Sequence, residues 1–248
     1  MLRYPGSKRR LCAVLDAALP PDVTSVAAPF FGSGAYEFHL ARRNISVVGA
    51  DIDIYLVNYF NMLCTNAAGV AEKILKIGIS IDRPAFSELR EALLNRPRLN
   101  SVTNAAIYFI LNRTSYNGIM AYFTPGTRIT QLAVQRLRRF SWPPALALLE
   151  CCDVFEFLEK HGDKYWFLDP PYYGVRDGLY GLKRTNHAFD HERLAEFLRS
   201  RPAARWMLTY NDTPEIRALY SFARIIAHDV MYKCKYTTKR EVIILSPA

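Results

Sequence analysis

The chain has 248 residues, 50% of them hydrophobic, and a formal net charge of +9 at pH 7. Its length and composition are those of a globular protein with one substantial core, or one core with a small appended subdomain. No apolar run reaches the ~20 residues that cross a bilayer, which excludes a membrane-spanning helix, while the basic charge favours a polyanionic partner such as nucleic acid.

The N-terminal stretch MLRYPGSKRRL is basic but lacks the apolar segment of a signal peptide, so we expect a cytoplasmic protein. The five cysteines are an odd number and contain no CxxC pair. They therefore predict neither a zinc site nor a disulfide framework, and we expect no bound metal.

Short apolar runs that end in turn or acidic residues recur along the chain and are typical of buried strands. They are found at residues 24–30, 45–51, 165–169, 205–211 and 240–246. Helical patterns, such as those at 34–44 and 190–200, lie between several of them. Alternating strands and helices predict an α/β fold with an open, mostly parallel sheet, whose ligands bind at the carboxyl ends of the strands. Asp51, Asp169 and Asn211 fall at these ends.

The middle of the chain differs, because no convincing buried strand occurs from about Asn58 to Phe140. Helical patterns, such as that at 105–118, take their place. We therefore expect a sheet domain made of residues 1–57 and 141–248, interrupted by a mostly helical insertion at 58–140. The segment 124–140 contains four arginines and no acid, and these side chains either contact phosphates or form a solvated helix face: Arg128, Arg136, Arg138 and Arg139.

The stretch PFFGSGAYEF (29–38) follows the first expected strand and opens a helix. Gly32 and Gly34 would let the backbone approach a ligand closely. Glu37 stands where a dinucleotide fingerprint would have a third glycine, and the Walker pattern is missing. The turn thus favours a ligand with a cationic or neutral portion over a pyrophosphate. The alternative interpretation is a plain strand-to-helix turn that binds no ligand.

An acid ends the second expected strand, about twenty residues after this turn. Asp51 is placed to accept hydrogen bonds from ribose hydroxyls, with Asp53 as the alternative residue. A surface acid that caps the next helix is the competing interpretation.

The stretch YWFLDPPYYG (165–174) ends the third expected strand with an acid and two prolines. The carboxylate of Asp169 and the backbone carbonyl of Pro170 are two acceptors on one rigid turn, which suits both hydrogens of an exocyclic amine. Tyr172 offers a flat face on which a base could stack. A base in a duplex would have to flip out to reach this turn. A strand-ending turn with an exposed acid is the alternative.

Taken in order, these pieces resemble the Dam-type DNA adenine methyltransferases, which use S-adenosylmethionine (SAM) and carry a DPPY motif. The resemblance covers most of the chain and rests on RYPGSKRRL (3–11), PFFGSG (29–34), ADID (50–53), ILNRTSYNGIMAY (110–122) and FLDPPYY (167–173). It implies a Rossmann-like SAM-methyltransferase sheet with a helical DNA-recognition insertion. It also implies transfer of a methyl group to the N6 amine of a flipped adenine, without a metal.

The resemblance assigns roles around the cofactor and the target base. Asp169 and Pro170 would bind the target amine, and Tyr172 would stack on the base. Asp51 would hold the ribose, and Asp153 would lie near the cofactor's adenine. The remaining residues that would line the SAM pocket are Tyr4, Gly6, Lys8, Phe30, Gly32 and Gly34, with Asp169 beside them.

The partner that the resemblance implies is double-stranded DNA. Tyr116 would wedge into the duplex with help from Asn117, and the other expected DNA contacts are Arg3, Lys8, Arg113, Arg128 and Arg136. Members that recognise GATC have an arginine at the position of Ala121, so the resemblance does not extend to GATC specificity here.

The resemblance further suggests a bacterial or phage-encoded protein that acts as a monomer, with a cognate restriction enzyme as a candidate partner. The alternatives are a SAM-dependent enzyme that methylates an amine of RNA or of a protein glutamine, and a non-catalytic DNA-binding relative. A dehydrogenase is disfavoured by Glu37 and by the acid–proline turn.

Overall fold

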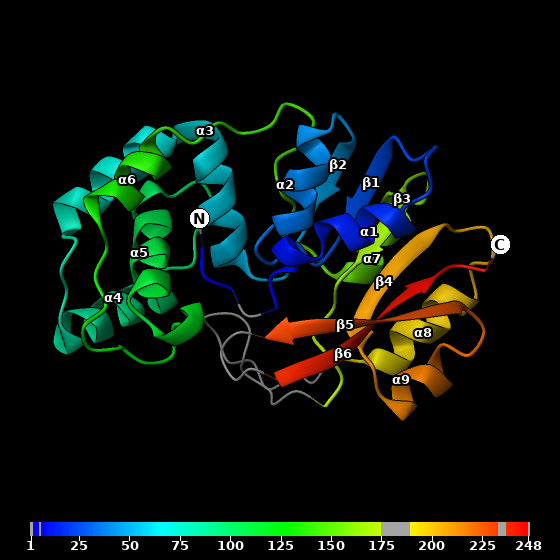
Figure 1. Cartoon of the computed structure of the whole chain (residues 1–248). Coiled ribbons are helices and arrows are strands. Elements are labelled where there is room, and N and C mark those ends of the chain that lie inside the picture. Colours follow the sequence, from blue (N-terminus) through cyan, green and yellow to red (C-terminus); the bar gives the residue numbers. More distant parts are fainter. Residues whose placement is uncertain (1, 5, 175–188, 233–236, 248) are drawn as a thin grey trace.

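The computed structural model describes residues 2–4, 6–174, 189–232 and 237–247, and Figure 1 shows a sheet on one side and a group of helices on the other. Across the sheet the strand order is β2-β1-β3-β4-β6-β5. The first four strands pair in parallel, whereas β6 is antiparallel to both of its neighbours. The strands are β1 (Ser25–Ala28), β2 (Ser46–Gly49), β3 (Tyr165–Leu168), β4 (Trp206–Asn211), β5 (Arg224–Tyr232) and β6 (Thr237–Leu245). This sheet confirms the predicted α/β, Rossmann-like fold.

Each of the five expected runs contains a strand, but the sequence pattern missed β5. This strand lies at the edge of the sheet and pairs only with β6 in the part of the chain that the structure describes. Its sequence mixes Arg224, His228 and Asp229 with apolar residues, because an edge strand is partly exposed. A search for continuous apolar runs therefore does not find it.

The sheet is covered on both faces. Alternate residues, such as Val26 and Phe167, pack against α1 (Cys12–Ala18), α2 (Ala35–Arg42) and α3 (Ile54–Ile77). The intervening residues, such as Trp166 and Leu208, pack against the helices of the other face. These helices are α7 (Val154–Lys160), α8 (His191–Arg199) and α9 (Pro214–Leu219). Full burial of such side chains contributes about 1.5–3 kcal/mol each, which explains the near-continuous hydrophobic strands.

Residues 146–150 run alongside β2 without forming a regular strand. Val47 pairs in parallel with Leu146, and Ala50 with Glu150. The backbone N–H of Asp51 donates to the carbonyl of Glu150 at 3.1 Å. This segment extends the sheet edge and brings Asp153 close to the carboxyl end of β2.

Helices occupy the chain between β2 and residue 140. They are α3 (Ile54–Ile77, kinked at Asn66), α4 (Arg83–Asn95), α5 (Val102–Arg113), the 3-10 turn η2 (Tyr116–Gly118) and α6 (Gln131–Arg138). Tyr59 of α3 stacks on Phe109 of α5 with ring centroids 6.3 Å apart. Phe60 also contacts Phe31 beside the sheet, with centroids 5.0 Å apart, so one apolar core runs through both parts. The division at residues 58 and 140 stays a prediction.

Four of these helices begin with a side-chain cap that the sequence supplies. Asp53, Asp82, Ser101 and Thr130 each accept a hydrogen bond from a backbone N–H of the first turn. Such caps contribute about 1 kcal/mol each. Among the described residues, no helix has the length and apolar character needed to cross a membrane.

Candidate active site

The predicted site residues gather at the carboxyl edge of the parallel strands. The glycine-rich turn follows β1, Asp51 follows β2, and Asp169 follows β3. Strand order reverses between β1 and β3, because β2 lies beyond β1 and β4 lies beyond β3. Ligands of open α/β sheets bind at this reversal point. The glycine-rich turn and the acid–proline turn flank it.

Asp169 makes two short contacts through one oxygen. Its Oδ1 lies 2.6 Å from the Nζ of Lys8 and accepts a hydrogen bond from the Oγ1 of Thr209 at 2.7 Å. Lys8 is buried and also donates to the carbonyl of Gly6 at 3.1 Å. Burial raises the pKa of Asp169, while the Lys8 ammonium opposes that rise. One oxygen of Asp169 thus accepts from an N–H donor and an O–H donor.

The rest of the acid–proline turn is tied to the neighbouring strands. The hydroxyl of Tyr172 donates to the Oε2 of Glu241 on β6 at 2.7 Å. The side-chain amide of Asn211 on β4 donates to the carbonyl of Tyr173 at 3.0 Å. The Lys8 ammonium lies 4.8 Å from the centroid of the Tyr172 ring. Pro170 is buried at the start of this turn.

The glycine-rich turn has the backbone geometry that only glycine adopts readily. Gly32 has φ +49° and Gly34 has φ +64°. A Cβ on Gly32 would lie 3.0 Å from the ring of Tyr4, so the N-terminal segment packs directly on the turn. Ser33 and Ser7 link the same two segments through a hydroxyl–hydroxyl hydrogen bond of 3.0 Å. Phe30, half-buried, packs edge-on against Phe189 with centroids 5.4 Å apart.

Asp51 and Asp53 have different roles. Asp51 accepts hydrogen bonds from the backbone N–H groups of Gly32 and Asp53, both at 3.0 Å, so it ties β2 to the glycine-rich turn. Asp53 caps α3 through the N–H of Tyr55 at 2.9 Å. Asp153 is exposed and caps α7 through the N–H of Phe155 at 2.9 Å. Helix capping therefore occupies Asp53 and Asp153, whereas Asp51 faces the turn.

Glu37, which stands where a dinucleotide fingerprint would have a third glycine, is deeply buried. It lies on the first turn of α2 and is 3% exposed. Burial raises the pKa of Glu37 to about 8, and the Asp169 carboxylate adds to that rise while Lys8 opposes it. Glu37 and Asp169 thus interact electrostatically with each other and with the Lys8 ammonium. With this pKa Glu37 is largely protonated at pH 7, so Asp169 is the negative partner of Lys8.

The N-terminal segment also contacts the end of α5. The backbone N–H of Arg3 donates to the Oδ1 of Asn112, and the amide of Asn112 donates back to the carbonyl of Arg3, both at 2.8 Å. Asn112 further donates to the carbonyl of Gly118 at 3.2 Å. This buried asparagine joins two of the quoted motifs, RYPGSKRRL and ILNRTSYNGIMAY, although sequence reasoning gave it no role. Its only signal was a polar residue within an apolar helical stretch.

Two arginines lie together at this junction. The Nη1 of Arg3 donates to the backbone carbonyl of Arg113 at 3.2 Å. Burial and the neighbouring Arg3 guanidinium lower the pKa of Arg113. Within the described parts of the chain, neither guanidinium forms a salt bridge with an acid. Paired cations of this kind suit an anion such as a phosphate.

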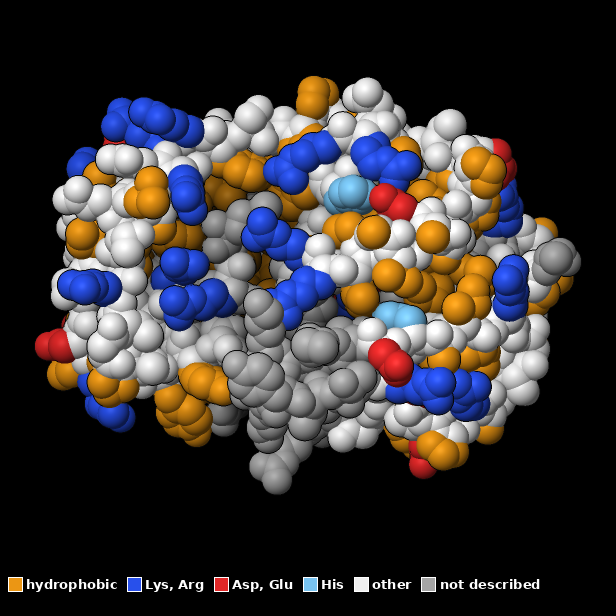
Figure 2. All heavy atoms as spheres, viewed as in Figure 1, with side chains coloured by type: hydrophobic (Ala, Val, Ile, Leu, Met, Phe, Trp, Pro, Cys, Tyr) orange, Lys and Arg blue, Asp and Glu red, His pale blue; other side chains and the backbone are white. Residues whose placement is uncertain are grey.

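The turn after α5 presents an aromatic side chain to solvent. Tyr116 is 65% exposed, and Asn117 next to it has φ +50°. Left-handed backbone at a residue other than glycine costs free energy and is common at functional sites. Arg128 and Arg136 are exposed, and Arg138 lies 3.7 Å from Glu72. Figure 2 shows Lys and Arg side chains gathered around the hollow between the helices and the sheet.

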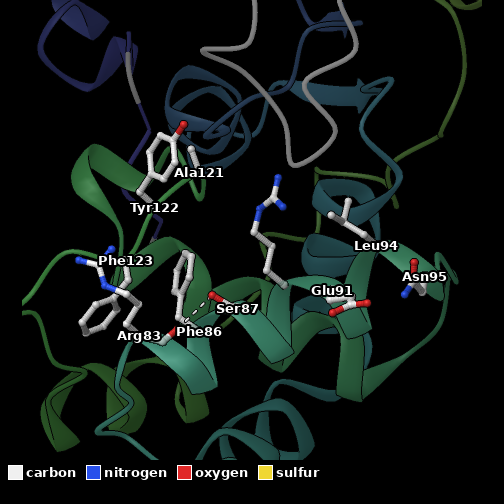
Figure 3. Close-up of a pocket in the computed structure, with 10 residues that line it drawn as sticks. Arg83, Phe86, Ser87, Glu91, Leu94, Asn95, Ala121, Tyr122 and Phe123 are labelled. Atoms are coloured by element: carbon white, nitrogen blue, oxygen red, sulfur yellow. Dashed lines mark hydrogen bonds between the residues drawn. The ribbon is translucent and has the colours of Figure 1, made fainter.

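A separate pocket of about 410 Å³ lies in the helical region, between α4 and residues 121–123 (Figure 3). Phe86 and Tyr122 line it, and the Nε of Arg90 donates to the carbonyl of Met120 at 3.1 Å. Ala121 borders this pocket. Ala121, which stands where GATC-recognising proteins would have an arginine, therefore places a small side chain beside an open cavity.

The mostly parallel sheet, covered by helices on both faces, is the fold of one class of protein, the Rossmann-like methyltransferases. A family model described as "D12 class N6 adenine-specific DNA methyltransferase" matches residues 4–234, and the chain belongs to this family. It is also 25% identical over 245 residues to a protein of Haemophilus influenzae named "DNA adenine methylase", covering 90% of this chain and 83% of that protein. These matches confirm the resemblance and the predicted activity, methylation of adenine in DNA.

The residues present fit the cofactor that the family implies. SAM carries a cationic sulfonium, and the Asp169 carboxylate stands at the strand-reversal point where such a ligand would bind. Asp51 is an acceptor beside the glycine-rich turn, as ribose hydroxyls require. Among the described residues, no three or more His, Cys, Asp or Glu side chains are grouped as a metal site would need.

Proposed function

We propose that this protein moves the methyl group of SAM directly to the N6 amine of an adenine that has rotated out of double-stranded DNA. The observation that carries the proposal is the Asp169 carboxylate, held by Thr209 at a rigid turn and already in contact with an N–H donor, the Lys8 ammonium, at 2.6 Å. An adenine amine is another N–H donor, which the same oxygen could accept.

The chain's own residues would act by positioning. Asp169 and the carbonyl of Pro170 would accept the two N–H groups of the amine, which reduces its conjugation with the ring and directs its lone pair. Tyr172 would stack on the base. SAM, when bound, supplies the electrophilic methyl group. The amine nitrogen would form a bond to the methyl carbon as the carbon–sulfur bond breaks, S-adenosylhomocysteine would leave, and the amine would release one proton. Catalysis then depends on alignment and on electrostatic stabilisation within a partly buried site.

The cofactor would lie along the turns at the carboxyl edge of the sheet. Asp51 would hold the ribose, and Asp153 would lie near the adenine ring. Lys8 and Asp169 would border both the cofactor and the target base. The other residues proposed to surround the cofactor are Tyr4, Gly6, Phe30, Gly32 and Gly34. The close packing of Tyr4 on Gly32 supports a shared role for these segments.

DNA would lie against the helical side of the site. The exposed ring of Tyr116 would enter the duplex beside the flipped base, with Asn117 next to it. Arg3 and Arg113, a pair without an acidic partner among the described residues, would contact phosphates or base edges. Arg128 and Arg136 would contact phosphates. Residues 58–140 would thus form the target-recognition insertion.

The wider setting follows from the substrate. A DNA methyltransferase of a bacterium or phage would act in the cytoplasm, where the DNA lies. Action as a monomer, and a restriction enzyme that recognises the same sequence, remain predictions.

The proposed role of Asp169 is tested by Asp169→Ala, with Asp163→Ala as a matched control on an exposed turn. We expect methyl transfer to fall at least 10²–10³-fold, as when one transition-state hydrogen bond is lost, while SAM affinity measured by calorimetry falls far less, because the other residues around the cofactor remain. The control should retain both. An equal loss of transfer and of SAM binding in Asp169→Ala would contradict the assigned role.

A further inference from the structure

A buried acid on the last strand contacts the proposed stacking residue. Glu241 is 2% exposed and pairs with Asn211 of β4 and His228 of β5 in the sheet register. Its Oε2 accepts the hydrogen bond of the Tyr172 hydroxyl at 2.7 Å, across 69 residues of sequence. Neither the family's motifs nor the proposed chemistry gives this glutamate a role.

The ring of Tyr172 is held at both ends, by the backbone at one end and by the hydrogen bond to Glu241 at the other. The backbone end lies directly after Pro170 and Pro171, whose φ angles are locked. The hydroxyl end is held by Glu241 on a different element of the sheet. These two restraints fix the long axis of the ring. Because a phenolic O–H prefers to lie in the plane of its ring, the direction of the hydrogen bond to Glu241 also restricts rotation of the ring about that axis.

The chemistry of Glu241 indicates more than packing. Burial of a carboxylate is costly unless hydrogen bonds compensate for the lost hydration, and an apolar side chain would fill the same space without that cost. A charge-assisted hydrogen bond is shorter and more directional than apolar contact. Glu241 is therefore better suited to orienting the ring of Tyr172 than to increasing the stability of the core.

We propose that Glu241 is a positioning residue for the methyl-transfer reaction: through the Tyr172 hydroxyl it sets the plane on which the target adenine stacks. This inference rests on the proposed function, in which Tyr172 stacks on the flipped base. A ring held in one plane would keep the N6 amine aligned with Asp169 and Pro170. Because small misalignments of reacting groups reduce rates strongly, loss of the hydrogen bond should lower kcat more than binding.

The test uses the full chain with four variants. Tyr172→Phe removes the donor, Glu241→Leu removes the acceptor, Glu241→Gln retains an acceptor, and Tyr172→Phe/Glu241→Leu removes both partners. Glu196→Gln, on an exposed face of α8, is the control. Each variant is assayed for kcat and for the Kd of SAM and of duplex DNA. A duplex with 2-aminopurine at the target position reports by its fluorescence on flipping and stacking of that base.

We expect Tyr172→Phe and Glu241→Leu each to lower kcat about 10- to 100-fold, with both Kd values within about twofold of the wild type. The two variants should alter the 2-aminopurine emission of the bound complex in the same way. The double variant should be no worse than either single one, because both remove the same interaction. Glu241→Gln should recover most of the lost rate.

Several results would overturn the inference. Additive effects in the double variant, or wild-type kcat in Tyr172→Phe, would show that Glu241 does not act through this hydroxyl. If Glu241→Leu does not fold, Tyr172→Phe alone still decides the question. Wild-type protein that transfers no methyl group to adenine, or that leaves 2-aminopurine emission unchanged, would instead refute the proposed function, and the inference with it.

Discussion

The buried carboxyl group of Glu37 links the stability of this protein to pH. Burial raises the pKa of Glu37 to about 8 in the folded state, from an ordinary value of 4.5. The folded chain therefore binds this proton more tightly than the unfolded chain does. It follows that the contribution of Glu37 to stability is largest below pH 4.5 and falls as pH rises through 8.

Glu37→Gln should remove this dependence. The free energy of unfolding of the variant, measured relative to that of the wild type, should rise between pH 5 and pH 9. The rise should amount to a few kcal/mol, because each unit of pKa difference between the folded and unfolded states corresponds to about 1.4 kcal/mol. Urea titrations at a series of pH values measure it. The difference between the two proteins isolates Glu37 from Asp51 and Asp169, whose pKa values burial also raises. A constant difference across this range would contradict the assignment.

Tyr116 provides a test of base flipping at a single side chain. If its exposed ring stabilises the gap that the flipped adenine leaves, Tyr116→Ala should slow methylation of a fully paired duplex. The loss should be smaller on a duplex with a mismatch at the target adenine, because that base leaves the stack more easily. Initial rates on the two duplexes measure the ratio. Tyr122→Ala is the control, because Tyr122 lies outside η2 and its side chain is also exposed, at 69%. An equal loss on both duplexes would argue against a wedge.

Local motifs made part of the site predictable, because their residues are close in sequence. Gly32, Gly34 and Asp169 stand in short stretches that determine a turn at the end of a strand. Thr209 reaches Asp169, 40 residues away in sequence, and Glu241 reaches Tyr172, 69 residues away, only through strand pairing. No local pattern reports such distant contacts, so sequence reasoning missed both residues.

At the scale of elements, apolar patterning predicted the five strands that lie within buried runs and missed the exposed edge strand β5. It also predicted helices from residue 58 to 140, where α3–α6 lie. The pattern could not show that the aromatic side chains of α3 contact Phe31, which makes the apolar core continuous. Such packing depends on the three-dimensional path of the chain rather than on the period of apolar residues.

The segment that contains Arg128 and α6 provides a prediction of its own. If Arg128 and Arg136 contact phosphates, the affinity for duplex DNA should fall steeply with salt. Arg128→Gln/Arg136→Gln should reduce the slope of log K against log salt by about 2, since each phosphate contact contributes about 0.9. Fluorescence anisotropy at several salt concentrations measures this slope.

Arg224→Gln is the matched control for that experiment. Arg224 is exposed at the start of β5, at the edge of the sheet opposite to the site. It should leave the salt dependence unchanged. An unaltered slope in the double variant would mean that Arg128 and Arg136 only form a solvated surface.

At the scale of the whole molecule, the charge and the site have complementary roles. The net charge of +9 suits a polyanion, and basic side chains gather around the hollow between the helices and the sheet (Figure 2). Inside, Asp169 contacts Lys8 at 2.6 Å, and Glu37 and Glu241 are buried acids that interact electrostatically with Asp169. The basic side chains thus lie on the surface, where DNA would bind, whereas the acids of the site are buried.

The central claim is methyl transfer from SAM to adenine in DNA, and one measurement tests it most directly. The protein is incubated with labelled SAM and unmethylated genomic DNA, followed by nucleoside analysis and single-molecule mapping of modified adenines. We predict label in N6-methyladenine at one repeated short sequence. Absence of label in DNA from a protein that still binds SAM would contradict the account.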